Sequence, residues 1–306
     1  MYRKLTKEGE NFISHICDLH GEKLLQGNNG PLSFTEPIIN KTWYTNVSYN
    51  RNGILTAINN ANDLKSAFIY LFNKYSEIYK LDANIMAAQA YAESNFKIWN
   101  YAPYPSTASG ISQFIMPSIY GVVIRNSLPV NPKFTEDEIN KLTDGLSNPL
   151  DENSYRVKYR VAKDNRPILH QNVIDNLEIM IKAQCFYMRY IANNCNDLAS
   201  TSLFCYNRGT FFRKTYTESI DFCRNHKVSK KNPRYYEEGV DYVWKIFGML
   251  CDKNNEAIGR VKPKGYYFGY GPTNPNPELQ LDVTQFPNRN FNRYKANVDE
   301  SQLKFG

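Results

Sequence analysis

Glu93 carries the strongest chemical signal in the sequence. It stands in the string AESNF (residues 92–96), near the C-terminal end of a predicted helix and before a proline-rich loop. Ile85, Gln89 and Glu93 lie on one helical line, because residues four apart share a face. Partial burial and the negative end of the helix dipole both disfavour ionisation of a carboxylate. We therefore expect Glu93 to have a pKa above the ordinary glutamate value, which is the profile of a general acid. A glutamate at a helix end is, on its own, more often a solvated surface residue, so the assignment depends on the other strings.

Three further strings follow in chain order and contain hydroxyl, amide and aromatic side chains. The first is ASGISQ (residues 108–113), which Met116 and Pro117 follow. The second is CYNRG (205–209), and the third is EGVDYV (238–243). Amide groups and aromatic faces of this kind can bind a sugar. Each string is short, so their order and joint presence are what make the signal specific.

Together with Glu93, these strings resemble the motifs of the lytic transglycosylase family, which cleaves peptidoglycan with a goose-type-lysozyme-like fold. The family has Glu-Ser with an aromatic residue two positions on, then Gly-Ala-x-Gly-Leu-Met-Gln and Met-Pro, then Ala-Tyr-Asn-x-Gly and Glu-Thr-x-x-Tyr-Val. Here Thr107 replaces the first glycine, Ser112 replaces the methionine, and one extra residue precedes Met-Pro. A family helix with Asn-Ile-x-x-Gly-x-x-Tyr-Leu is matched only loosely, by Asn176, Leu177 and the run to Met188. The resemblance covers roughly residues 62–250.

The resemblance implies a mainly α, lysozyme-like fold and a reaction that needs one carboxylate. Glu93 would protonate the glycosidic oxygen between N-acetylmuramic acid and N-acetylglucosamine as an oxocarbenium-like sugar develops. The same group, now a carboxylate, would take the proton of the muramic C6 hydroxyl, which closes a 1,6-anhydro ring. Glu238 would help to position the catalytic region, and neither a cofactor nor a metal is implied. The residues implied in substrate binding are Ser109, Gln113, Tyr206, Asn207 and Tyr242.

Other functions stay open at this point. A hydrolytic muramidase of the same fold is one alternative, and an inverting hydrolase would need a second carboxylate about 6.5–9.5 Å from the first to hold a water molecule. A segment at 126–171, which looks like an insertion, offers acidic residues that we expect to be mostly solvated surface charges: Glu136, Asp137, Glu138, Asp144, Asp151 and Glu152. The changes at Thr107 and Ser112 also leave open a non-catalytic virion structural or wall-binding protein, since a fold does not establish a function.

The elements that carry the first motif are predicted to be two helices. Apolar residues at helical spacing from Leu64 to Tyr79 predict an amphipathic helix of about 17 residues. Asp82 is then a good N-cap for a second helix, which runs toward Phe96 and carries Glu93.

Further helices are predicted for the rest of the chain. The insertion contains strings that suggest a short helix and a strand, and the apolar run 173–192 predicts a central buried helix of about 20 residues. A short helix from Ser200 to Asn207 should stop at Gly209, and residues 235–250 should form the last helix.

The composition is that of a folded globule with a moderate basic excess. The chain has 306 residues, of which 42% are hydrophobic and 14% aromatic, too many packing residues for global disorder. Its 37 Lys and Arg against 30 Asp and Glu give a charge of +7, which favours a polyanionic partner such as a cell wall. Nucleic acid is not the expected partner, because the one dense basic run, at 224–234, suits a solvated loop. Six dispersed cysteines without a CxxC pair predict free buried thiols.

The predicted organisation has three parts. Residues 1–60 form an N-terminal arm or small subdomain, 61–252 the catalytic domain, and 253–306 an extended C-terminal arm. The N-terminus lacks an apolar run of the length that a signal peptide or membrane span needs. We therefore expect a bacteriophage protein, made in the cytoplasm, that reaches the host wall or periplasm as a virion component or by another route that needs no Sec signal. Its expected partners are peptidoglycan glycan strands and, through the arms, tail or capsid proteins.

Overall fold

The structure is a computed structural model in which the described residues fall into several stretches. They are residues 2–25, 60–98, 100, 108–115, 118, 122, 126–143, 160–161, 167–168, 177–209, 239, 242–243, 245–246, 249–250 and 305.

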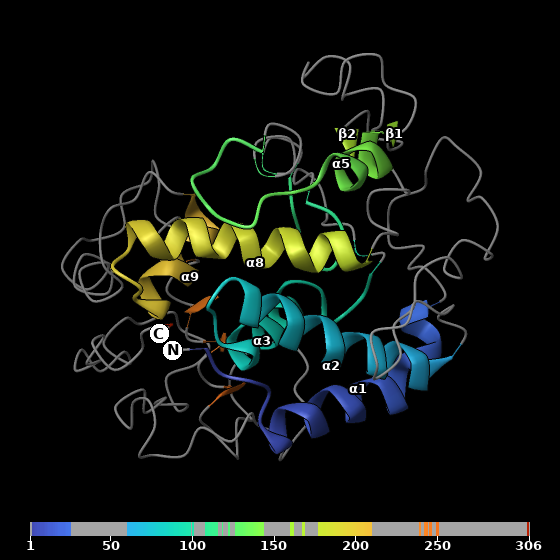
Figure 1. Ribbon diagram of the computed structural model, residues 1–306. Coiled ribbons are helices and arrows are strands. Elements are labelled where there is room, and N and C mark those ends of the chain that lie inside the picture. Colours follow the sequence, from blue (N-terminus) through green and yellow to red (C-terminus); the bar gives the residue numbers. More distant parts are fainter. Residues whose placement is uncertain are drawn as a thin grey trace, which may run out of the picture. The chain divides into compact units, whose positions relative to one another are not determined.

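The protein is mainly helical, as predicted (Figure 1). The helices are α1 (Lys7–Leu25), α2 (Ala61–Ile78), α3 (Ala83–Ser94), α5 (Glu136–Thr143), α8 (Leu177–Asn194) and α9 (Ala199–Arg208). The strands β1 (Arg160–Val161) and β2 (Pro167–Ile168) pair antiparallel within the insertion. Of the predicted last helix, the described residues 239, 242–243, 245–246 and 249–250 are helical. None of the helices in the described ranges is long and apolar enough to cross a membrane.

The chain divides into two compact units. Unit 1 comprises residues 1–12, 80–88 and 188–306, and unit 2 comprises residues 13–79 and 89–187. Each unit is described below by itself. Because α1, α3 and α8 contribute residues to both units, the division does not follow the predicted boundaries near residues 60 and 252, which stay predictions.

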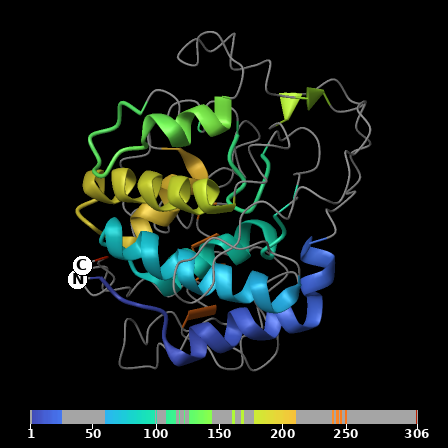
Figure 2. The ribbon, with the colours of Figure 1, turned by 45° about the vertical axis from the view of Figure 1, so that its right-hand side comes forward.

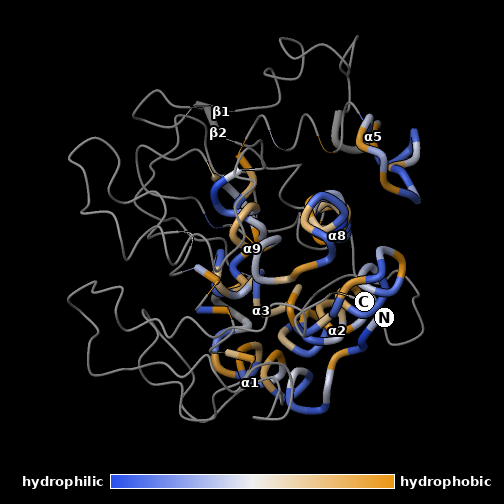
Figure 3. Tube along the Cα trace, turned by 90° about the vertical axis from the view of Figure 1, so that its left-hand side faces the viewer, coloured by the Kyte–Doolittle hydropathy of each residue, from blue (hydrophilic) through white to orange (hydrophobic). Residues whose placement is uncertain are grey.

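Helix α2 supplies much of the core of unit 2 and confirms the predicted amphipathic helix. It begins after Asn60, whose Oδ1 accepts hydrogen bonds from the backbone N–H groups of Asn62 (2.9 Å) and Asp63 (3.0 Å). This is the N-cap arrangement that satisfies the free amides of a first helical turn. Figure 3 shows hydrophobic and hydrophilic residues alternating along α2. Its buried residues are Leu64, Ala67, Phe68, Leu71, Phe72, Tyr75 and Ser76.

Within unit 2, the later turns of α1 pack closely on the start of α2. A Cβ atom added to Gly21 would lie 2.4 Å from the Cβ of Ala61, a separation that real side chains do not reach. Lys65 of α2 also forms an ion pair with Asp18 of α1 (3.6 Å). Gly21 is therefore required by the close approach of the two helices.

Unit 1 holds residues from both ends of the chain. The backbone of Arg3 pairs with the segment before α3, donating to the Leu81 carbonyl (3.4 Å) and accepting from the Ala83 N–H (3.0 Å). Phe305 is buried, and its N–H donates to the carbonyl of Asp197 (2.9 Å). At these two points the predicted arms contact their own chain. Docking of the arms to a virion partner stays a prediction, and residues 26–59 and 251–304 lie outside the described part of the chain.

Candidate active site

Glu93 lies where a buried helix reaches the surface. The predicted N-cap is confirmed, since Asp82 Oδ1 accepts a hydrogen bond from the Asn84 N–H (2.9 Å). All residues of α3 are buried except Ala92 and Glu93, which are half-buried. Glu93 is thus held by a regular element and is accessible in part to solvent, which suits a residue that must reach a bound molecule.

The helix ends just after Glu93 in an unusual backbone conformation. The helix, predicted to run toward Phe96, ends at Ser94, and Asn95 and Phe96 then both adopt positive φ values, of 54° and 61°. Left-handed backbone is uncommon for a bulky residue such as phenylalanine. It is held there because the Phe96 ring is fully buried, with ring centroids of Phe68 at 5.1 Å and Tyr91 at 5.3 Å. This aromatic cluster fixes the point at which the chain leaves the helix.

The loop that carries ASGISQ is tied to the segment that follows α3. The carbonyl of Asn100 accepts hydrogen bonds from the Gly110 N–H (2.8 Å) and from Gln113 Nε2 (3.1 Å). The N–H of Ser109 donates to the Phe114 carbonyl (3.0 Å), which closes a tight turn between them. Gly110 has a φ of 78°, a conformation that glycine adopts without strain. The two halves of the first motif are therefore brought together in unit 2.

The two sugar-binding candidates of this loop differ in exposure. Ser109 is fully buried, whereas Gln113 is half-buried. The amide of Gln113 also donates to the Gly110 carbonyl (2.8 Å), so its nitrogen is used to hold the loop. In the described part of the chain no hydrogen bond to Gln113 Oε1 is found, and this oxygen is the atom that we expect to face a sugar.

The second motif lies in unit 1, at the end of α9. This helix stops at Arg208, and Gly209 follows with a φ of 89°, which confirms the predicted glycine stop. Tyr206 and Asn207 lie in its last turn and are half-buried. Asn207 Oδ1 accepts a hydrogen bond from Arg208 Nε (2.6 Å), so its position is set by a neighbour in the chain.

The third motif contacts α9 through a glycine. A Cβ atom added to Gly239 would lie 2.5 Å from the ring of Phe204 and 2.8 Å from Cγ of Arg208. Tyr242, three residues on, is buried. Unit 1 therefore brings the second and third motifs side by side. Of the other motif residues, Thr107, Met116, Pro117 and Glu238 lie outside the described ranges.

Replacing Gly239 by alanine is expected to destabilise unit 1. The new methyl group would overlap a fully buried ring, and overpacking of this kind costs about 1–3 kcal/mol. Urea unfolding followed by circular dichroism would measure the loss. In a double variant, Phe204→Leu should make room for the methyl group, so the two changes should cost less together than the sum of each alone. Additive costs would contradict the contact.

Comparison of the chain with families of known proteins, with curated protein sequences and with solved structures finds no match.

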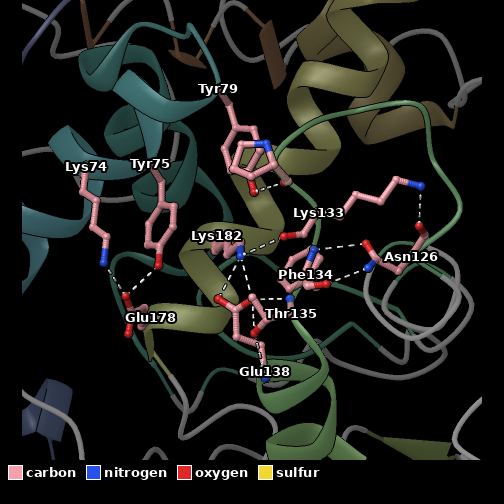
Figure 4. Close-up of polar contacts among 11 residues, drawn as sticks. Lys74, Tyr75, Tyr79, Asn126, Lys133, Phe134, Thr135, Glu138, Glu178 and Lys182 are labelled. Carbon is pink, nitrogen blue, oxygen red and sulfur yellow. Dashed lines mark hydrogen bonds and ion pairs between the residues drawn. The ribbon is translucent and has the colours of Figure 1, made fainter.

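The acidic residues of the insertion differ in their exposure to solvent. Glu136 and Asp137 are exposed, as expected, but for Glu138 the expectation of a solvated surface charge is wrong. Its side chain is 20% exposed, and both oxygens bind Lys182 Nζ of α8, at 2.8 and 2.7 Å. Figures 2 and 4 show α5 beside α8 and this ion pair between them. The other candidates, Asp144, Asp151 and Glu152, lie outside the described residues.

Glu138 is further held by a capping box at the start of α5. Its Oε2 accepts a hydrogen bond from the Thr135 N–H (2.7 Å), and the Glu138 N–H donates to Thr135 Oγ1 (3.2 Å). This pattern, T-x-x-E, satisfies two free amides of the helix start. The signal is present in the sequence, where Thr135 stands three residues before Glu138.

A second carboxylate, that of Glu178, lies near this pair and also accepts hydrogen bonds (Figure 4). It accepts hydrogen bonds from Lys74 Nζ (2.8 Å) and from the hydroxyl of Tyr75 (2.6 Å). Burial raises the pKa of Glu178, and the positive charge of Lys182 partly offsets this effect. Burial likewise lowers the pKa of Lys74. These contacts fasten α2 to α8 within unit 2.

The described cysteines are free, as predicted. Cys17, Cys185, Cys195 and Cys205 form no disulfide, and burial raises the pKa of the Cys17 thiol to about 12. A thiol with so high a pKa is a poor nucleophile. Within the described residues, no three His, Cys, Asp or Glu side chains gather as a metal site would require.

Proposed function

We propose that the protein is a peptidoglycan lytic transglycosylase with a lysozyme-like helical domain, in which Glu93 acts first as acid and then as base. The observation that carries the proposal is the burial pattern of α3. Ten residues of this helix are buried and the half-buried pair Ala92 and Glu93 stands in its last turn, followed by a chain segment to which the ASGISQ loop is tied. The motif resemblance supports the same residue.

In the proposed reaction the Glu93 carboxyl acts in two successive steps, first as an acid and then as a base. Protonated Glu93 gives its proton to the glycosidic oxygen as the bond from C1 of N-acetylmuramic acid to that oxygen breaks. The resulting carboxylate then accepts the proton of the C6 hydroxyl, and O6 bonds to C1. Protons and electrons balance within the substrate and Glu93, so no water is consumed. Gln113 would hydrogen-bond the sugar through its amide oxygen.

A hydrolytic muramidase is the rival within the same fold. It would need a second carboxylate free to bind a water molecule. Both oxygens of Glu138 are committed to Lys182, and one also accepts from the Thr135 N–H. Among the described acidic residues of the insertion, Glu138 is therefore a poor base for such a water molecule.

Mass spectrometry of digested peptidoglycan tests the proposal. We expect the purified protein to release muropeptides that end in 1,6-anhydro-N-acetylmuramic acid, lighter by one water than the products of hydrolysis. Release of reducing muropeptides alone would establish a hydrolase. Sedimentation of the protein with peptidoglycan, without release of any product, would instead establish a wall-binding protein.

The setting of this activity is a proposal of the same kind. An enzyme of this class in a bacteriophage would open the host wall during entry or lysis, for example as part of the virion. Its net charge of +7 suits an anionic wall. Detection of the protein in purified virions, by mass spectrometry of their polypeptides, would test this placement.

A further inference from the structure

We propose that Gln184 is a positioning residue for this reaction, which it serves by holding the ASGISQ loop in place relative to the helical turn that carries Glu93. It acts through a buried chain of hydrogen bonds formed by Ser112, Gln184 and Gln89, called the amide chain below. The inference rests on the proposed function. It adds a residue that lies outside the strings AESNF, ASGISQ, CYNRG and EGVDYV.

The amide chain joins three elements of unit 2. Ser112 Oγ, in the loop, donates to Gln184 Oε1 of α8 (3.1 Å). Gln184 Nε2 donates in turn to Gln89 Oε1 of α3 (2.9 Å). All three side chains are 0% exposed. The loop is thereby connected to α3 across α8, without contact with water.

Both ends of the amide chain adjoin residues assigned to the site. Ser112 directly precedes Gln113, and Gln89 stands four residues before Glu93, one helical turn away on the same face. The loop has a separate tie to Asn100, which follows α3. The loop is thus attached at Gly110 and Gln113 to Asn100 and at Ser112 to Gln184, and two attachments restrict its position relative to the last turn of α3 more than one would.

Stability does not explain why the side chains of the amide chain are polar. Among the described residues Gln89 Nε2 has no hydrogen-bond partner, although it is buried. A buried donor without an acceptor destabilises a fold, and apolar side chains of similar size would avoid that cost. Proteins keep such departures mainly where a site requires them. The amide chain is therefore better explained by the geometry that it imposes on the loop.

The sequence change at Ser112 supports this explanation. Ser112 stands where the resembled family has methionine. Its hydroxyl group donates a hydrogen bond to Gln184, which a methionine could not do. The departure that weakened the motif at Ser112 has a structural partner in Gln184.

Kinetics of the variant Gln184→Leu test the inference. We expect kcat on purified soluble glycan strands to fall by roughly 10- to 100-fold, because small misplacements of a site have effects of this size, while KM changes little. Ser112→Ala should lower kcat similarly, and the double variant should be no slower than Gln184→Leu alone, because both break one chain. Amide hydrogen exchange at the Gly110 and Gln113 N–H groups should accelerate in both single variants.

A matched control separates positioning from general loss of stability. Ile181 lies in the same part of α8 and is fully buried, but takes no part in the amide chain. Ile181→Ala should lower the unfolding temperature and leave kcat and the loop exchange rates unchanged. An equal loss of kcat in Ile181→Ala, or an unchanged kcat in Gln184→Leu, would overturn the inference.

The same assay distinguishes this inference from the function on which it rests. Wild-type protein and Glu93→Gln are measured beside the variants. Absence of Glu93-dependent cleavage in the wild type would overturn both the proposed function and the inference. Glu93-dependent cleavage that Gln184→Leu leaves intact would overturn the inference alone.

Discussion

Replacing Glu93 by glutamine is expected to abolish cleavage of purified peptidoglycan. Glutamine has nearly the same shape but cannot give a proton to the glycosidic oxygen or take one from the C6 hydroxyl. Loss of a general acid lowers rates by roughly 10²- to 10⁴-fold, and here the same group serves both steps. Liquid chromatography of released muropeptides would measure the loss, and circular dichroism would establish that the helical fold remains.

The control for this variant is a second Glu-to-Gln change on a neighbouring helix. Glu77 is exposed in the last turn of α2, so Glu77→Gln should leave cleavage unchanged. Glu93→Asp keeps the carboxylate but withdraws it by one methylene, and should lose most activity because position matters as much as charge. Wild-type rates in Glu93→Gln would remove this residue from the mechanism.

Truncating Phe96 to alanine is expected to cause the largest loss of stability. The ring is fully buried and packs against Phe68, Tyr91 and Phe72, the last with ring centroids 6.2 Å apart. Truncation of a buried phenylalanine costs about 3–5 kcal/mol, a large part of the about 5–15 kcal/mol by which a folded domain is stable. Urea denaturation would measure the change in the free energy of unfolding.

A glycine variant at the same position tests the backbone conformation separately. Alanine would keep the strain of a positive φ, whereas glycine adopts 61° freely. We therefore expect Phe96→Gly to be at least as stable as Phe96→Ala, the reverse of the order found at ordinary positions. A clearly less stable glycine variant would show that this backbone conformation carries no strain.

The helices were readable from the sequence because their signals are local. The spacing of apolar residues placed α2 correctly, and the N-cap at Asp82 and the stop at Gly209 mark the start of α3 and the end of α9. Each depends on residues within one or two turns, which is the range over which periodicity and capping act. The short helix of the insertion was found for the same reason, as α5 (Glu136–Thr143).

The end of α3 could not be read in this way. The run toward Phe96 looks helical, and neither Asn95 nor Phe96 is the glycine that usually marks a left-handed turn. What bends the chain is the pocket for the Phe96 ring, to which Phe68, some 28 positions earlier, contributes. Contacts of such separation leave no local pattern.

Prediction of the site had the same limit. Glu93 and Gln113 could be named because short motifs include them, and the structure ties their two segments together through Asn100. Gln184 belongs to no such string and is recognisable only from its bonds to Ser112 and Gln89. The burial of Glu138 likewise depends on Lys182, 44 residues later, so the sequence favoured a solvated charge.

The pairing of Arg3 with the segment before α3, and of Phe305 with Asp197, has a consequence for biosynthesis. Unit 2 ends at residue 187, so all its residues can meet while the ribosome is still making the rest of the chain. Unit 1 cannot complete its contacts until residue 305 has been made, because Phe305 donates a hydrogen bond to Asp197. Unit 2 should therefore acquire its native packing on the nascent chain earlier than unit 1 does.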